Sequence, residues 1–175
     1  MASISAWADA NLAGGKRGQS SKVSGGQVRN FALTYAKLGA ADGDGTILGI
    51  AEIPANAVLT SLLINNAALA GFTSISAGYY KKANDGTFLD TALSGGTSGK
   101  AVLMSAVDLN AGKANGSEQN GLVAVAIGDL SKKVWELLGY ATPEASDGDY
   151  ALCLTFTTAG TAAGNIVVRG SYILG

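Results

Sequence analysis

The sequence predicts an all-β protein, a jelly-roll-like antiparallel β-sandwich with one short helix and an extended N-terminal arm. Apolar and polar residues alternate with a period of two in most segments after residue 27. Roughly eight such runs are separated by segments rich in Gly, Asn and Asp, which is the spacing of a sandwich or barrel. No linker or internal repeat interrupts them. We therefore expect a flexible arm over residues 1–27 and a single domain over residues 28–175.

The expected arm shows neither a strand period nor a helix period. It is rich in Ala, Ser and Gly, and it carries Trp7 together with the cations Lys16, Arg17 and Lys22. Its apolar surface is too small for independent folding, so it is either a frayed terminus or a segment that becomes ordered on a neighbouring subunit. In the second case Trp7 would fill an apolar pocket and the three cations would contact acidic groups. The first residues lack the segments of a signal peptide, so we expect no secretory route.

Strands are expected in order along the domain, and the first contains Phe31, Leu33 and Tyr35 on one face. In the third run, residues 58–65, Leu62 and Ile64 share a face with Val58 and Thr60 if the alternation is strict. Asn84-Asp85-Gly86 predicts a tight turn before Phe88-Leu89. In the run 150–156, Tyr150, Leu152, Leu154 and Phe156 share a face. The expected strands cover residues 28–38, 46–53, 58–65, 73–82, 88–89, 100–109, 121–128, 150–156 and 165–174.

One segment departs from this alternation. Leu130, Val134, Leu137 and Leu138 recur at helical spacing, which predicts a short helix of two or three turns over one end of the sheet. Asp129 or Ser131 is the candidate N-cap, and Gly139 is the candidate C-terminal stop.

The composition excludes several kinds of site. The chain has no His and a single Cys, so it lacks a Ser-His-Asp or Cys-His pair and the usual ligands of transition metals. We therefore expect no catalytic residues, no metal and no cofactor. The net charge of -1 argues against nucleic acid as a partner, and no apolar run is long enough for a membrane helix.

Individual motifs add little. Asp42 and Asp44 have the spacing that opens a calcium loop, but Ile47 and Ile53 stand where that loop needs Gly and Glu. The Gly-rich stretch 94–100 lacks the full spacing of a phosphate-binding loop. Tyr80 is expected at a strand end beside Lys81 and Lys82, although these residues could also form a stacking patch for a sugar or nucleic acid. Cys153 is expected to be a small buried hydrophobe.

Three segments carry a resemblance to a known family. The phrase AEIPANAVLTSLLINNAAL (51–69), the phrase KKVWELLGY (132–140) and the closing segment from residue 149 to residue 174 resemble the jelly-roll head decoration (cement) proteins of tailed bacteriophages. The resemblance implies a structural, non-enzymatic virion protein, made in the cytoplasm of the host bacterium, that binds the outer surface of the capsid and stabilises it. It also implies the major capsid protein as a partner and a homotrimer as the assembly, with no nucleic acid and no membrane.

Two alternatives remain open at this point. The same phrases would fit another virion module, associated with a tail, neck or fibre. A carbohydrate-binding β-sandwich is the alternative from a different class, although aromatic residues make up only 7% of the chain and several fall on expected core faces.

Overall fold

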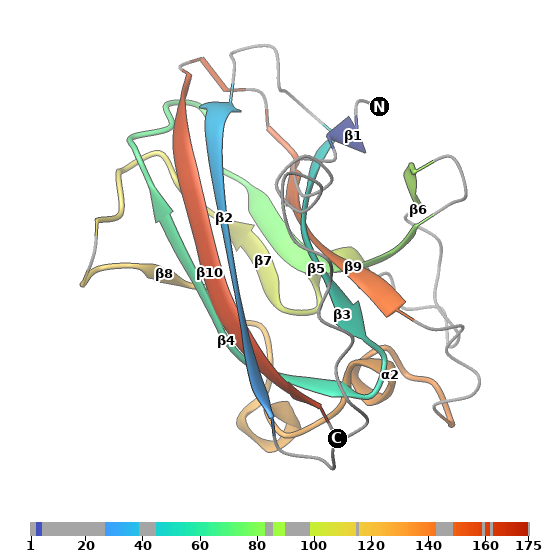
Figure 1. Cartoon of the computed structure of the whole chain (residues 1–175). Helices are drawn as coiled ribbons and strands as arrows, with labels where there is room; N and C mark the ends of the chain where they lie inside the picture. Colours follow the sequence, from blue (N-terminus) through green and yellow to red (C-terminus); the bar gives the residue numbers. More distant parts are fainter. Residues whose placement is uncertain are drawn as a thin grey trace, which may run out of the picture.

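The computed structural model describes residues 3–4, 27–38, 45–82, 86–89, 99–114, 116–142, 149–158, 160–161 and 163–174, and two β-sheets facing each other dominate it (Figure 1). Sheet I contains, in spatial order, β2 (Val28–Leu38), β10 (Gly164–Leu174), β4 (Ala57–Asn66) and β8 (Gln119–Asn120). Sheet II contains β1 (Ser3–Ile4), β3 (Thr46–Pro54), β9 (Asp149–Phe156) and β5 (Ile75–Lys82), with β6 (Phe88–Leu89) and β7 (Met104–Val107) both paired to β5. Helical turns are η1 (Gly99–Ala101), η2 (Ile127–Asp129) and α2 (Val134–Leu137).

The strand pairing is that of a rolled antiparallel hairpin. With β1 and β6 set aside, the first strand pairs with the last and the second with the last but one, giving the pairs β2–β10, β3–β9, β4–β8 and β5–β7. Each of these pairs is antiparallel, and successive pairs belong alternately to sheet I and sheet II. This is the arrangement of a jelly-roll-like sandwich, so the predicted fold class is confirmed.

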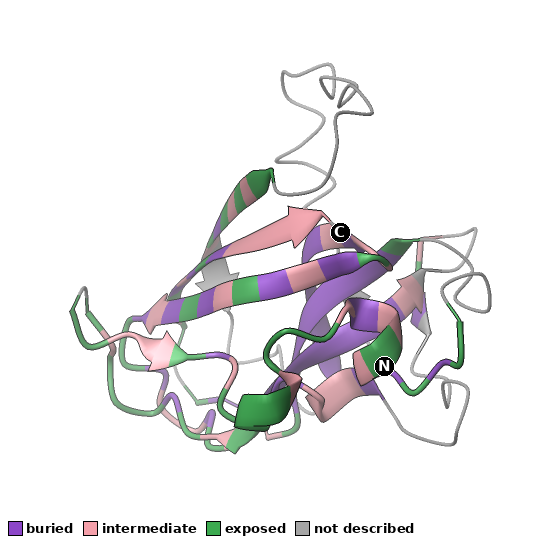
Figure 2. Cartoon of the chain, turned by 90° about the horizontal axis from the view of Figure 1, so that it is seen from below, coloured by how far each residue is buried: buried purple, intermediate pink, exposed green. Residues whose placement is uncertain are grey.

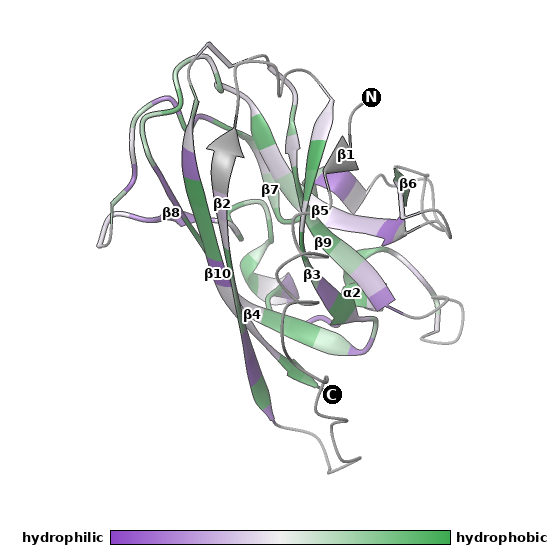
Figure 3. Ribbon diagram, turned by 45° about the horizontal axis from the view of Figure 1, so that its top comes forward, coloured by the Kyte–Doolittle hydropathy of each residue, from purple (hydrophilic) through white to green (hydrophobic). Residues whose placement is uncertain are grey.

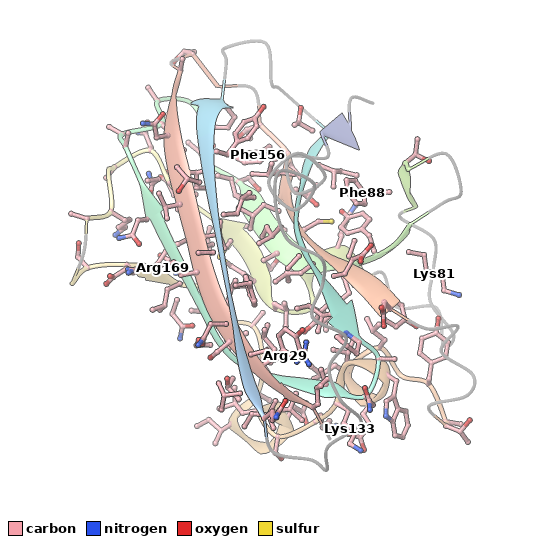
Figure 4. The ribbon with its side chains drawn as sticks, in the orientation of Figure 1. Arg29, Lys81, Phe88, Lys133, Phe156 and Arg169 are labelled. Carbon is pink, nitrogen blue, oxygen red and sulfur yellow. The ribbon has the colours of Figure 1, made fainter. Side chains whose placement is uncertain are left out.

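The core lies between the sheets and matches the faces predicted from the alternation. On β9, Tyr150, Leu152, Leu154 and Phe156 all point into the main core cluster. The inward residues of β2 and β10 close the other side, and Figure 3 shows the hydrophobic and hydrophilic stretches along β10. Figure 4 places Phe156 between the two sheets. Burial of this alternating face is the main source of stability, because apolar area removed from water is the dominant favourable term in folding.

The two sheets differ in how their outer faces are covered. Buried and exposed residues alternate along β4, whereas β9 is buried from Tyr150 to Phe156 (Figure 2). The outer face of sheet II carries a second apolar cluster, whose members are Ile47, Tyr80, Phe88, Ala151 and Cys153. Tyr80 is therefore not at an exposed strand end as expected. Its side chain is only 1% exposed, because Phe88 of β6 packs beside its ring.

The face assignment of the run 58–65 is wrong in its first half. Ala57 and Leu59 are buried, and after them Leu62 and Ile64 are buried, so the inward face changes parity within β4. The cause is a register shift opposite the Ser171–Tyr172 step of β10, which inserts one extra residue into β4.

The expected strand over 121–128 is also absent. Residues 121–124 form turns, and Ile127 begins η2. The backbone bonds to different parts of the sandwich, since Gly121 N–H donates to Leu62 O at 2.7 Å and Ala124 N–H donates to Leu103 O at 2.9 Å. The segment therefore bonds to β4 of sheet I and to the connection between η1 and β7, and it does not extend either sheet.

The predicted helix is shorter than expected and begins later. It consists of the single turn α2, whose N-cap is Lys133 and not Asp129 or Ser131. Asp129 instead ends η2. The predicted stop at Gly139 is confirmed, because this residue has a φ of 79°, which favours glycine. The strand expected over 100–109 shortens to β7 because η1 occupies its first residues.

Candidate interaction surfaces

A cluster of metal-ligating side chains is not assembled in the residues that the structure describes. No group of three or more His, Cys, Asp or Glu side chains lies together there. Cys153 is fully buried, and burial raises the pKa of its thiol, so the prediction of a small buried hydrophobe is confirmed. No helix within the described ranges is long and apolar enough to cross a membrane.

The residues predicted to contact a neighbour, Trp7, Lys16, Arg17 and Lys22, lie outside the described residues, as do Asp42 and Asp44. Near the start of the chain, the described pair Ser3–Ile4 forms β1, which runs parallel to β3 opposite Ile47 and Leu48. The contact role of the four predicted residues therefore stays a prediction.

One end of the sandwich collects several unrelated segments, and we call it the α2 end. The start of β2 meets the end of β10 there, since Val28 pairs with Ile173. The turn between β3 and β4 lies at the same end, because Leu174 pairs with Ala57 and Trp135 N–H of α2 donates to Ala55 O at 3.1 Å. We define the α2 end as residues 28–29, 55–57, 127–138 and 173–174 (Figure 1).

Large apolar side chains are exposed at the α2 end. Ile127 is 90% exposed, Val28 58% and Leu130 44%. The turn that carries Ile127 and Leu130 is hydrogen-bonded, because Asp129 N–H donates to Ala126 O at 2.8 Å and Lys132 N–H donates to Asp129 O at 3.0 Å. Their exposure is therefore a property of an ordered turn.

Hydrogen bonds and packing hold α2 in place. Val134 and Leu138 are buried in the main core, and the Lys133 N–H donates to the Glu136 carboxylate at 2.7 Å. That bond satisfies one of the backbone donors that a helix start leaves free. The indole Nε1 of Trp135 is buried without a hydrogen-bond acceptor among the described residues.

The α2 end also carries a buried cationic nitrogen without an acceptor among the described residues. Arg29 lies on the inward face of β2, and its Nε is buried without an acceptor within the described part of the chain. Figure 4 shows Arg29 and Lys133 at the same end of the molecule. Lys132 differs, since its ammonium lies 2.7 Å from Asp129 and this partner raises its pKa. A buried guanidinium nitrogen without an acceptor is unfavourable, so a carboxylate from another molecule that accepts a hydrogen bond from Nε would stabilise this position.

The opposite end, which we call the hydroxyl end, is polar and internally satisfied. We define it as residues 45, 70–74, 157–158 and 160–161. The hydroxyl of Thr158 accepts hydrogen bonds from the backbone N–H groups of Thr73 at 3.0 Å and of Ser74 at 3.2 Å. The hydroxyl of Thr157 donates to Ser74 O at 2.7 Å. These hydroxyl groups find their partners within the chain, so this end has little need of another molecule.

The outer face of sheet I carries a shallow depression of about 490 Å³, lined by Asn30, Phe31, Ala32, Ser61, Leu63, Arg169 and Gly170. The guanidinium of Arg169 donates to Glu118 at 2.9 Å and to Asn65 at 3.2 Å. The hydroxyls of Thr60 and Ser61 lie 2.8 Å and 2.7 Å from that of Ser171. The guanidinium already has its acceptors, and the three hydroxyls are hydrogen-bonded among themselves. This face is therefore a weaker candidate for a contact with another protein than the α2 end.

The exposed residues of the α2 end were missed by sequence reasoning. Ile127 was assigned to a two-sided apolar strand, although Gly121 and Gly128 bracket that run and favour turns. Nothing in the sequence indicated that Arg29 is partly buried, because a cation near the start of a strand is ordinarily solvated.

Comparisons with known proteins agree with the fold. A chain of a solved structure titled "Capsid of Ralstonia phage GP4" matches with a TM-score of 0.62 and 15% identity, and the match covers 99% of each chain. A chain of "Cyanophage Pam1 capsid asymmetric unit" matches at 13% identity over 94% of this chain and 96% of that one, but its TM-score of 0.36 is too low to support an argument. No family model and no curated protein matches the sequence. At full length, therefore, this chain shares its fold with a chain found in a phage capsid.

Proposed function

We propose that the protein is a non-enzymatic structural component of a bacteriophage virion that binds the outside of the capsid lattice and stabilises it, as a decoration or cement protein. The observation that carries the proposal is the similarity of fold, over the full length of both chains, to a chain of a phage capsid. The exposed apolar side chains of the α2 end and the buried Nε of Arg29 without a described acceptor support it, since both would be stabilised by contact with another protein.

Stabilisation follows from selective binding. A protein that binds the assembled lattice, and not the free capsid subunit, shifts the equilibrium toward the assembled shell by mass action. Its partner is then the major capsid protein. A cyclic homotrimer suits positions of local threefold symmetry on such a lattice, and closed symmetric oligomers are the rule for soluble assemblies.

The direct test is to mix the purified protein with heads that lack it and to measure occupancy by electron microscopy. Saturable occupancy at one class of lattice position, together with greater resistance of the heads to heat, is the expected result. Isolated tails serve as the comparison, and binding to tails alone would replace the decoration role with that of a tail or neck module.

The assembly and the arm are tested in the same system. Light scattering at micromolar concentration should give a trimer, and a monomer would contradict this part of the proposal. Deletion of residues 1–27 should leave the sandwich folded and weaken attachment. Trp7→Ala alone should lower the affinity about 30-fold if Trp7 is an interface anchor. Attachment equal to that of the parent would show that the arm does not dock.

A further inference from the structure

We propose that the α2 end faces the capsid and the hydroxyl end faces away from it, and that the capsid surface beneath the α2 end is apolar with a carboxylate opposite Arg29. This inference rests on the proposed function and adds to it the orientation of the molecule and the chemistry of its partner.

The distribution of exposed apolar side chains gives the first argument. Five large apolar residues are exposed among those that the structure describes, and three of them, Val28, Ile127 and Leu130, belong to the α2 end. Leu63 lies on the outer face of sheet I, and Val123 lies on the turn that leads to η2. Apolar groups held in water by an ordered backbone favour association, so this end gains most from being covered.

Charge gives the second argument and selects the occupant. Asp129 pairs with Lys132, and the Glu136 carboxylate accepts the backbone N–H of Lys133. Among the described residues, the one buried cationic nitrogen without an acceptor is Nε of Arg29. If the partner were a second copy of this chain bound through its own α2 end, it would bring another arginine that also lacks an acceptor. A different protein that presents a carboxylate supplies that acceptor, and charge-assisted bonds from Arg to a carboxylate are among the stronger polar contacts.

The hydroxyl end gives the third argument, by contrast. The Thr157 hydroxyl donates to Ser74 O, and the Thr158 hydroxyl accepts a hydrogen bond from Thr73 N–H. No large apolar residue described at that end is exposed. Such an end is stable in water without a partner. The chemical difference between the two ends therefore fixes which of them points to the shell.

Thiol labelling tests the orientation, because the native Cys153 is buried and should not react. Ile127→Cys reports on the α2 end, and Thr161→Cys is the matched control at the hydroxyl end, where Thr161 is also exposed. With nine-tenths of the copies bound to heads, maleimide should modify Ile127→Cys about tenfold more slowly than in free protein, since only the unbound fraction reacts. Thr161→Cys should react at the same rate free and bound.

Several outcomes overturn the orientation. Unchanged labelling of Ile127→Cys on heads, or protection of Thr161→Cys, places another surface against the shell. Protection of Ile127→Cys already in the free protein shows that the α2 end is a contact between copies. If the parent protein does not bind heads, the proposed function and this inference fail together, whereas binding with the wrong labelling pattern removes only the inference.

A second variant tests the carboxylate. Arg29→Gln should weaken binding to heads roughly 30-fold, as expected when one partner of a buried charge pair is removed, and Arg29→Lys should recover part of the loss. Arg169→Gln, on the outer face of sheet I, is the control for loss of a cation. Unaltered melting temperatures would show that the Arg29 variants are folded. Binding of Arg29→Gln as tight as that of the parent would refute the carboxylate contact.

Discussion

Gly78 gives a sharp test of how sheet II is packed. It lies on β5 opposite Cys153 of β9, and its outer side faces η1. An ideal Cβ at this position would lie 1.8 Å from Gly99 O and 2.6 Å from the carbonyl carbon of Lys100. Both atoms belong to the backbone, so no rotamer change relieves the overlap, and Gly99 O must move by at least about 1.2 Å to reach the 3.0 Å limit of real contacts.

Movement of η1 disturbs the bonds around it. Val102 N–H donates to Gly99 O at 3.4 Å, and Leu103 N–H donates to Ala77 O of β5 at 3.1 Å. Overpacking of a filled site costs about 1–3 kcal/mol, and displacement of backbone puts Gly78→Ala near the upper limit, about 3 kcal/mol. For a chain of this length that corresponds to a fall in melting temperature of roughly 6–12 °C.

Urea denaturation measures the change. Gly78→Ala should lower the midpoint without altering the slope. Gly128→Ala is the matched control, because nothing lies within 4 Å of its Cβ position, and it should unfold at or slightly above the midpoint of the parent. Equal midpoints for Gly78→Ala and Gly128→Ala would refute the packing of η1 on β5.

Three further predictions follow from single sites. Phe156→Ala should cost about 3–5 kcal/mol in free energy of unfolding, because its ring is fully buried 5.3 Å from that of Phe72, and a midpoint equal to the parent's would show that the face assignment is wrong. Gly139→Ala should cost about 1–2 kcal/mol, because its φ of 79° is left-handed, and calorimetry will measure this loss. The backbone N–H groups of Glu118 and Gly116 hold the pKa of the Glu118 carboxyl below its usual value, with a further contribution from Arg169. The folded pKa is therefore below the unfolded one, so the stabilisation is complete above the unfolded pKa and is lost as the pH falls through the folded pKa. Glu118→Gln should then lower the melting temperature at about pH 7 and have less effect at about pH 3, and the opposite trend would contradict the assignment.

Strand faces were predictable wherever a strand is regular. Leu33 on β2 and Leu154 on β9 lie inside because residues two apart share a face, and the sequence alternates without interruption there. The sandwich follows from this pattern, since each sheet has an apolar face that must be covered.

The shift within β4 was not predictable, because a bulge changes parity without changing composition. Thr60 and Ser61 look like ordinary strand residues in the sequence. In the structure, the Thr60 hydroxyl donates to Ser171 O at 2.9 Å, at the step where the register with β10 shifts. Such a bond depends on a strand more than a hundred residues away, which a local period cannot reveal.

The turn at residues 121–128 was missed for a related reason. Its run of apolar residues resembles a strand buried on both faces. In the structure, however, both sheets are formed by other strands and neither includes this segment. Leu122 and Val125 pack against the main core from the side, whereas Ile127 remains in water. Tertiary context therefore decides between strand and turn, because an apolar run of this length is compatible with both structures.

The position of the contact surface follows from how the other faces are used. The outer face of sheet II is already occupied by the cluster around Tyr80 and Phe88, so a partner there would have to displace packed side chains. On the outer face of sheet I, Arg169 has Glu118 as its partner, and breaking that pair would have to be compensated by any ligand. A partner that binds at the α2 end has neither cost, because Ile127 is exposed to water and the Nε of Arg29 has no described acceptor that would have to be displaced. Substitutions within the sheets should therefore act on stability, and substitutions at the α2 end should act on attachment, which separates the two properties experimentally.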